Sequence, residues 1–306
     1  MVNLKQFGWR LFQIRVPEDW EMTAEGGGRG RTYIRLEDEQ MVRLEVRWDD
    51  ISPKKEPNVK KSLDSFLNEL KERVEKANLK FTRLGLREIE VAGHEGYLYH
   101  VRGGGELLGA SWYCNDSRRL FVVQVHFRTE EYERMREIFQ SLLESVVCHG
   151  RKWWTWSVYA FRFELPEEYE LYNYRLLSMY GRLSFRSKRD VWYVFAYQGM
   201  ANVILEERYN GDLKKWFKDA YLKEALKQYS YYKLAEEHKL SLKGHEGRRL
   251  IFKPRLSFLK KIVLDSFLWL CDVSNRILVM SVVAPEKVHS VISSEKERVL
   301  ESFTCH

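Results

Sequence analysis

The sequence predicts an α+β protein of two homologous domains, each an antiparallel β-sheet packed by helices in an α/β/α sandwich. Three observations predict this fold. The chain has 306 residues, more than one hydrophobic core usually supports. Short segments recur in the same order in its two halves. Within each half, strand-like patterns are interrupted by two helical patterns, one in the middle and one at the end.

The internal repeat sets the domain organisation. Three segments return in order: 12–20 as 161–169, the tetrapeptide Gly-His-Glu-Gly at 93–96 as 244–247, and 143–149 as 300–306. The spacing between partners drifts slowly, as two copies of one domain with small loop insertions would produce. The boundary falls near Gly150, which predicts domains over residues 1–150 and 151–306.

A cluster of tryptophans follows this boundary. Trp153, Trp154 and Trp156 align with residues 4–7 of the first copy. They predict a lead-in strand or a contact between domains, and an exposed aromatic patch for binding is the alternative.

The elements of copy one begin with strands and a helix. Apolar and polar residues alternate over 12–16 and over 42–48, which predicts two strands with one wet face each. Pro17 ends the first strand. A helix is expected over 59–77, where apolar residues recur at helical spacing.

The rest of copy one predicts a hairpin, a strand and a closing helix. Residues 89–91 lead into the Gly-His-Glu-Gly motif and 97–101 lead out of it, which is a hairpin pattern. Alternation over 121–127 predicts a further strand, and 132–146 place apolar residues on one face of a helix. In copy two, Pro285 predicts the start of the corresponding helix, because proline suits the first helical position.

These elements resemble the PsbP-like fold. The resemblance rests on a strand ending in Val-Pro-Glu-Asp-Trp (16–20), a mid-domain helix, a Gly-x-x-Gly hairpin, and a final helix ending in Leu-Glu-Ser-Val (143–146). The superfamily includes a photosystem II extrinsic subunit, a Ran-binding nuclear import factor and many bacterial and archaeal proteins. Its motifs are structural and bring no catalytic residues. The resemblance implies a protein that binds other assemblies and is not an enzyme.

Composition excludes several classes of protein. Hydrophobic residues make up 44% and charged residues 31%, so the chain is neither disordered nor fibrous. It contains no run of about 20 apolar residues and no apolar signal core, so we expect no membrane association and a cytoplasmic location. Four dispersed cysteines are too few for a disulfide scaffold, so we expect reduced thiols.

Two patterns carry metal-ligating side chains. The Gly-His-Glu-Gly repeat is interpreted as a turn, because glycine opens turn conformations and adjacent strand residues point to opposite sides. Cys148-His149 and Cys305-His306 recur at equivalent helix ends, and the four groups would complete a tetrahedral zinc site if the domain ends met. Duplication alone also explains the recurrence. We therefore predict no metal site and no cofactor, while sequence alone leaves open whether these four residues bind metal.

Charge is divided unevenly between the copies. Residues 1–150 hold 24 Lys and Arg against 25 Asp and Glu, a net charge of −1, while residues 151–306 hold 27 against 19, a net charge of +8. We predict two anion-binding clusters, one in a longer loop of copy two and one around its second strand: Arg248, Arg249, Lys253, Arg255, Lys260 and Lys261, and Arg182, Arg186, Lys188 and Arg189. Basic side chains release counterions from phosphates, and Phe252 or Phe258 could stack on unpaired bases. A solvated, charge-rich surface is the alternative.

No nucleophile elbow, phosphate loop or dinucleotide-binding motif is present, so we predict no catalytic residues and no small-molecule substrate. We expect a non-enzymatic cytoplasmic protein whose basic second domain binds RNA or a ribonucleoprotein such as the ribosome. Archaeal ribosome-inactivating, hibernation-type factors are similar in architecture, since they also consist of two related domains. A protein adaptor of the Ran-binding-factor type is the alternative, and a structural zinc or enzyme role comes third.

Overall fold

The computed structural model describes residues 3–28, 30–159, 161–254 and 261–305. The chain divides into two compact units, Met1–Tyr159 and Ala160–His306. This division lies a few residues beyond Gly150. Among the described residues, no helix combines the length and the apolar composition that crossing a membrane requires.

The tryptophans after Gly150 form a strand, β10 (Trp153–Val158), which belongs to the first unit. It lies beside β1 (Leu4–Gly8), where Gly8 N donates to Ser157 Oγ at 3.1 Å. Trp154 and Trp156 are buried, and the Trp156 ring meets the edge of Trp9 with 5.4 Å between centroids. Burial of these rings places the end of the first unit after β10, because the strand completes that unit's core.

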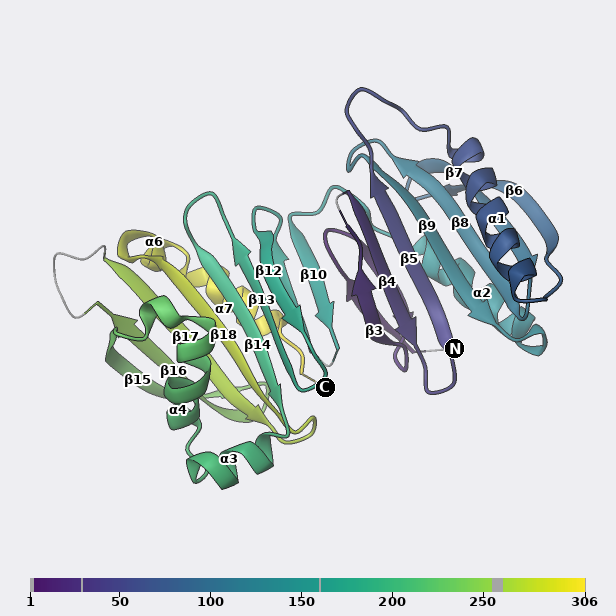
Figure 1. Ribbon diagram of the computed structural model, residues 1–306. Helices are drawn as coiled ribbons and strands as arrows, with labels where there is room; N and C mark the ends of the chain where they lie inside the picture. Colours follow the sequence, from purple (N-terminus) through teal and green to yellow (C-terminus); the bar gives the residue numbers. More distant parts are fainter. Residues whose placement is uncertain (1–2, 29, 160, 255–260, 306) are drawn as a thin grey trace. The chain divides into compact units, whose positions relative to one another are not determined.

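The first unit is built on a seven-stranded antiparallel sheet with the order β3-β4-β5-β9-β8-β7-β6 (Figure 1). Its strands are β3 (Glu21–Gly26), β4 (Arg31–Glu37), β5 (Val42–Asp50), β6 (Thr82–Val91), β7 (His94–Arg102), β8 (Glu106–Cys114) and β9 (Arg119–Phe127). A separate hairpin pairs β1 with β2 (Gln13–Pro17). The alternation seen in the sequence thus forms strands whose buried side chains face the packed layers.

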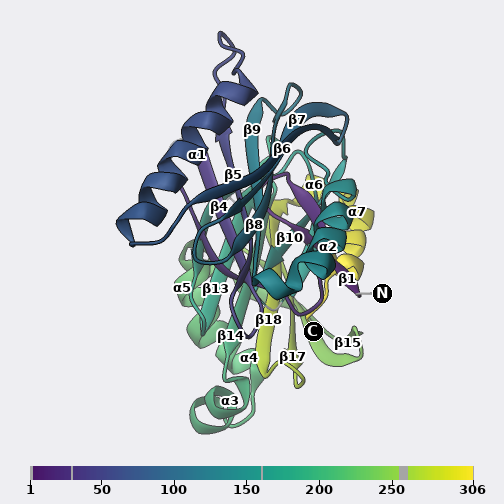
Figure 2. The same cartoon turned by 90° about the vertical axis from the view of Figure 1, so that its right-hand side faces the viewer.

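Helices cover both faces of this sheet (Figure 2). On one face, α1 (Val59–Lys76) begins at Asn58, whose side chain accepts from Lys61 N at 2.8 Å. It buries Leu63, Phe66 and Leu67 in a cluster with residues of the sheet. On the other face lie α2 (Tyr132–Glu144), preceded by the short η1 (Thr129–Glu131), and the β1–β2 hairpin.

The second unit repeats this sheet. Its strand order is β12-β13-β14-β18-β17-β16-β15, which matches the first unit strand for strand. The strands of the sheet are β12 (Glu170–Leu176), β13 (Tyr180–Arg186), β14 (Trp192–Gly199), β15 (Lys233–Leu242), β16 (His245–Lys253), β17 (Ile262–Cys271) and β18 (Arg276–Pro285). A further strand, β11 (Phe161–Pro166), lies outside this sheet. The predicted pair of homologous α+β domains is therefore confirmed.

The helical layers of the second unit differ from those of the first. In place of α1 stands a broken series: α3 (Ala201–Tyr209), α4 (Leu213–Trp216), the π-helical η2 (Phe217–Tyr221), α5 (Leu222–Ala225) and η3 (Lys227–Tyr229). The break after α3 occurs where Asn210 and Gly211 adopt positive φ of 52° and 73°. On the other face, α6 (Glu286–Val291) and α7 (Ser293–Ser302) stand where the first unit has α2. Pro285 directly precedes α6, as expected.

The Gly-His-Glu-Gly motif uses its glycines for two different purposes. The turn itself is formed by Ala92 and Gly93, with φ of 51° and 81°, and by Lys243 and Gly244 in the second unit, with φ of 52° and 83°. The predicted hairpin is present and the first motif glycine lies in its turn, but the histidine and glutamate are strand residues, so the turn does not extend over the whole motif. The second glycine lies inside the strand opposite a buried tryptophan.

Gly96 is required by the close approach of the neighbouring strand. It pairs with Trp112, which continues a row of aromatic residues through Phe121 to Trp48. A Cβ on Gly96 would lie 2.5 Å from Ser111 O and 2.9 Å from Trp112 Cβ, closer than real Cβ atoms approach. Only glycine fits here.

Candidate functional sites

The basic residues predicted to bind an anion lie at two separate places in the second unit. Among the described members, Arg248, Arg249 and Lys253 lie on β16 and Lys261 lies just before β17. The others lie on or just after β13: Arg182, Arg186, Lys188 and Arg189. Three strands, β14, β18 and β17, separate β13 from β16. Arg255, Phe258 and Lys260 lie outside the described residues. The structure therefore does not join the two clusters into one continuous patch.

Most of these cations are paired with acidic groups of the same unit. The Arg249 guanidinium donates to both carboxylate oxygens of Asp265 at 2.9 and 2.8 Å, and Arg248 donates to Glu237 at 2.6 Å. The other pairs are Lys253 with Glu236, Arg186 with Asp190, and Arg189 with Glu168 and Glu295. Lys188 and Lys261 are exposed. Phe252 is buried in the core, so the prediction that it could stack on a base is wrong.

Two cations from the separate clusters nevertheless face the same side of the sheet. Arg182 and Arg248 stand at the two ends of one row of paired residues that crosses β14, β18 and β17. Paired residues of antiparallel strands point to the same face. The side chains between them in this row belong to the core under α3 to α5.

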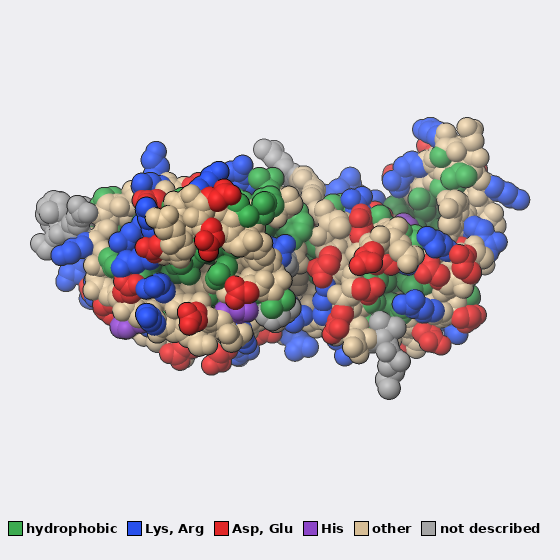
Figure 3. Space-filling view, turned by 90° about the horizontal axis from the view of Figure 1, so that it is seen from below, with side chains coloured by type: hydrophobic (Ala, Val, Ile, Leu, Met, Phe, Trp, Pro, Cys, Tyr) green, Lys and Arg blue, Asp and Glu red, His purple; other side chains and the backbone are tan. Residues whose placement is uncertain are grey.

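The helices on that face carry a set of lysines that the sequence reading did not single out. We call them the basic helical layer: Lys214, Lys215, Lys218, Lys223 and Lys227. Only two acidic residues, Asp219 and Glu224, lie in the same segment, 213–229. Lys214 and Arg248 share Glu237. In the view of Figure 3, Lys and Arg side chains stand among Asp and Glu side chains, so positive charge is spread out rather than gathered in one block.

The second unit also groups four charged or titratable side chains around one buried carboxylate, and we call them the charged tetrad: Arg249, Asp265, His289 and Lys296. Asp265 has no exposed surface and accepts from Arg249, from His289 at 2.9 Å and from Lys296 at 3.0 Å. Burial opposes its ionisation, but hydrogen bonds from Arg249 and His289 and the Lys296 charge outweigh that effect and hold the pKa of Asp265 well below its usual range. Burial lowers the pKa of Lys296.

The charged tetrad has an apolar counterpart in the first unit. The repeat offsets align its members with Leu98, Leu108, Tyr132 and Phe139. Both oxygens of Asp265 are occupied by neighbouring groups; Asp265 and Lys296 are buried, while the Arg249 and His289 side chains are 31% and 16% exposed. The tetrad therefore joins α6 and α7 to the sheet.

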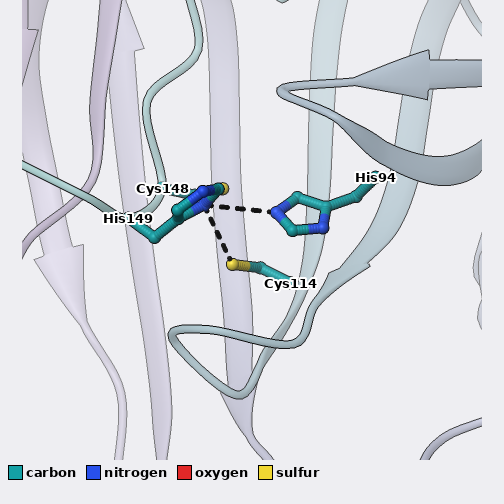
Figure 4. A group of neighbouring side chains, drawn as sticks. All are labelled: His94, Cys114, Cys148 and His149. Carbon is teal, nitrogen blue, oxygen red and sulfur yellow. Dashed lines mark hydrogen bonds between the residues drawn. The ribbon is translucent and has the colours of Figure 1, made fainter.

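The first unit gathers two histidines and two cysteines at one end of its sheet (Figure 4). His94 is the first residue of β7, Cys114 is the last of β8, and Cys148 and His149 follow α2. His149 Nδ1 lies 3.2 Å from His94 Nε2 and 3.5 Å from the Sγ atoms of Cys114 and Cys148. One ligand atom from each of the four lies within 4.8 Å of all the others. We call these residues the first His/Cys cluster.

Backbone contacts explain why the chain after α2 reaches this place. Val147 and Gln13 exchange two backbone hydrogen bonds of 2.9 Å, which fix the chain end against β2 just before Cys148. Thr304 and Arg162 make the same exchange in the second unit, at 2.8 and 2.9 Å.

Hydrogen bonds make the two thiols of the first cluster unequal. The hydrogen bond from Cys148 lowers the pKa of Cys114 to about 4 against the opposing effect of burial, helped by the Ser117 backbone N–H at 3.4 Å. The same bond, together with burial, raises the pKa of Cys148. On the other side of the His149 ring, Nε2 lies 3.8 Å from an oxygen of Asp116. At this distance the two groups are neighbours without a hydrogen bond, so Nδ1 faces the cluster while Nε2 faces the side of Asp116.

The second unit repeats the arrangement with His245, Cys271 and Cys305, the second His/Cys cluster. His245 is the first residue of β16, Cys271 the last of β17, and Cys305 follows α7. Cys305 Sγ lies 3.4 Å from His245 Nε2. Burial, reinforced by the hydrogen bond with Cys271, raises the pKa of Cys305 to about 11. His306 lies outside the described residues; in sequence it follows Cys305 as His149 follows Cys148.

The prediction from sequence is that no metal is bound. The arrangement it left open joins the two Cys-His pairs in one site between the domain ends and gives the motif histidines no role. The structure instead puts the described residues of each pair in a cluster within their own unit. Cys114 and Cys271 were missed as members. A signal for them was present, since all four cysteines of the chain fall at two positions of the repeat, and Cys114 aligns with Cys271 as Cys148 does with Cys305.

No protein-family model and no curated protein matches this sequence. Solved structures resemble it in fold. Cyanobacterial PsbP (CyanoP) from Synechocystis is 12% identical, with 49% of this chain and 94% of that chain covered and a TM-score of 0.40. The Ran-binding protein Mog1p of Saccharomyces cerevisiae is 10% identical, with 48% and 90% covered and a TM-score of 0.33.

Another solved structure spans both units. The immunity protein TplEi of a Pseudomonas aeruginosa type VI secretion system is 12% identical, with 99% of this chain and 97% of that chain covered and a TM-score of 0.32. At these levels the likeness concerns the fold alone. The two seven-stranded sheets of matching strand order define the class: a tandem of two α+β domains, as the sequence predicted.

Proposed function

We propose that this protein is a non-enzymatic, cytoplasmic binding protein whose second unit engages a polyanionic partner, RNA or a ribonucleoprotein such as the ribosome. One observation carries the proposal. Two copies of one fold differ in charge, with 24 basic and 25 acidic residues in 1–150 against 27 and 19 in 151–306. A shared fold does not require this difference, so it calls for a reason specific to the second copy.

The basic helical layer is the part of the second unit that fits this role. Lys215, Lys223 and Lys227 are exposed, and the layer covers the face toward which Arg182 and Arg248 also point. Lysines on a helical surface neutralise phosphates as point charges and do not depend on base sequence. The surface therefore fits the backbone of a nucleic acid better than a particular base.

RNA binding across a salt series tests the proposal with a matched control. In the test variant, Lys215, Lys223 and Lys227 become Gln. In the control variant, the same change is made at Lys61, Lys71 and Lys76, which are exposed on α1 of the first unit. Both variants lose three positive charges from a helical layer. Fluorescence anisotropy with a labelled single-stranded RNA gives the dissociation constant at each salt concentration.

We expect wild-type affinity to fall steeply with salt, and the slope of log K against log salt to decrease by about 2 in the test variant, since each lost contact to a single strand contributes about 0.7. The control variant should keep the wild-type slope. Equal losses in both variants would show general charge attraction without a site. Absence of binding at low salt would refute the proposal.

A protein adaptor is the second candidate, and an exposed apolar edge favours it. β12 is an edge strand of its sheet, and Tyr172 on it is 66% exposed, with Leu177 and Met179 exposed in the following turn. Edge strands with apolar side chains are sites where another chain can pair. If nuclease-treated lysate yields a partner that Tyr172→Ser loses and the lysine variant keeps, the adaptor is the better assignment.

A further inference from the structure

We propose that each unit holds a structural zinc ion, the first bound by His94, Cys114, Cys148 and His149, and the second by the His/Cys cluster of the other unit. This inference is independent of the RNA-binding proposal, because the clusters lie on other residues. It also revises the expectation from sequence that no metal is bound.

The distances in the first cluster match a zinc tetrahedron. Zinc binds sulfur at about 2.3 Å and nitrogen at about 2.0–2.1 Å, so the edges between tetrahedral ligands are about 3.3–3.8 Å. The contacts of His149 Nδ1 with His94 Nε2, Cys114 Sγ and Cys148 Sγ are 3.2, 3.5 and 3.5 Å. The contact between His245 Nε2 and Cys305 Sγ in the second cluster is 3.4 Å. These contacts have the length of tetrahedral edges, and the other ligand atoms of each cluster lie within 4.8 Å of one another.

The donor atoms select the metal. Two thiol sulfurs and two imidazole nitrogens are the ligand set of a closed structural zinc site, whereas magnesium and calcium prefer oxygen ligands. With four protein ligands, the first cluster fills the tetrahedral positions that a catalytic zinc would leave partly open.

The two copies agree at these positions while they differ elsewhere in the core. The charged tetrad of the second unit replaces two leucines, a tyrosine and a phenylalanine of the first, so four packing positions, two of them fully buried, have changed chemistry completely. The cysteines and the motif histidines have the same residue type in both copies. Packing alone would allow other small or apolar residues at the cysteine positions, whereas metal ligation does not.

A zinc ion at this place would hold together segments that are far apart in the chain. The ligands of the first cluster come from the start of β7, the end of β8 and the chain after α2. A metal that binds the folded arrangement and not the separated segments adds its binding free energy to folding. The site would therefore fix the C-terminal segment of each unit against its sheet.

The test uses the full chain, freed of any affinity tag, purified in reductant and reconstituted with zinc. We expect two zinc ions per chain by elemental analysis, and one in either Cys148→Ser or Cys305→Ser. His238→Asn, which removes an exposed histidine outside both clusters, should keep two. Wild-type protein titrated with cobalt should develop the strong visible absorption of tetrahedral cobalt thiolate and lose it when zinc is added.

The outcomes distinguish zinc binding by these thiols from disulfide formation between them. Removal of zinc by a chelator should lower the thermal unfolding midpoint of the wild-type protein. The His238→Asn control should remain soluble and show the same lowering. Absence of stoichiometric zinc and cobalt in the wild-type chain overturns the proposal, as does retention of two ions in both cysteine variants. If thiol titration of the denatured, unreduced protein finds fewer than four thiols, the clusters form disulfides instead. The cobalt titration uses wild-type protein, so it still decides the question if a cysteine variant fails to fold.

Discussion

His94 Nε2 and His149 Nδ1 lie 3.2 Å apart, although 55 residues separate them in the chain. Two structural features bring them together. The turn at Gly93 places His94 at the first position of β7, and the backbone exchange between Val147 and Gln13 fixes the chain after α2. The contact between the two histidines therefore depends both on the register of the hairpin and on the packing of the C-terminal segment.

The docking of that segment depends on a serine found in both units. Ser145 Oγ accepts from Arg15 N at 2.8 Å and donates to Leu142 O at 2.7 Å; Ser302 does the same with Glu164 N at 2.8 Å and Val299 O at 2.7 Å. Either serine changed to Ala should destabilise its own unit by about 1 kcal/mol. Hydrogen exchange resolved by peptide measures this. Ser141→Ala, on the exposed side of α2, should change little, and an equal effect there would contradict the prediction.

The close strand approach at the second motif glycine predicts unequal costs in the two units. An added Cβ would meet Ser111 O at 2.5 Å at Gly96, but Leu268 O at 3.0 Å at Gly247. Gly96→Ala should destabilise the first unit by about 1–3 kcal/mol, and Gly247→Ala should cost the second unit less. Gly28→Ala, where the Cβ meets nothing within 4 Å, is the control. Denaturant unfolding followed by hydrogen exchange distinguishes the units, and a larger loss at Gly247 would refute the argument.

The charged tetrad predicts that replacing one member destabilises the second unit more than replacing all four. Asp265→Leu leaves Arg249, His289 and Lys296 without their carboxylate, so the second unit should lose about 3–5 kcal/mol. Replacing all four members with the residues of the first unit (Arg249→Leu, Asp265→Leu, His289→Tyr and Lys296→Phe) should restore most of that loss. Thermal unfolding of the single and fourfold variants compares them. Equal stability of Asp265→Leu and wild type would show that the tetrad is not a coupled unit.

The same carboxylate sets an acid limit to stability. Its folded pKa lies well below the unfolded value of about 3.9, so its contribution is complete above that pH and is lost as the pH falls below it. Stability of the second unit should therefore fall steeply below about pH 4. Unfolding midpoints of wild type and Asp265→Asn, measured over a pH series, should differ most near neutrality and converge in acid. A constant difference at all pH values would exclude this linkage.

Local periodicity predicted much of the fold. The expected strand over 42–48 and helix over 59–77 are found as β5 and α1, because alternating or helical spacing directly reports which side of an element is buried. β8 was not predicted, because it lacks this signal. All nine of its residues are buried, so it shows no alternation between wet and dry faces. The broken series from α3 to η3 was also not foreseen, since the first copy offers no model for it.

By itself the sequence determined that one domain occurs twice, in which order its elements follow, and which copy carries the excess of positive charge. These properties depend on residues near one another in the chain or on a count. Only the tertiary structure decided that Cys114 joins His94, Cys148 and His149, and that Arg248 and Arg249 are held by acidic partners. Such residues are brought together by the register of the sheet and the packing of the helices. Their separation along the chain indicates neither of these.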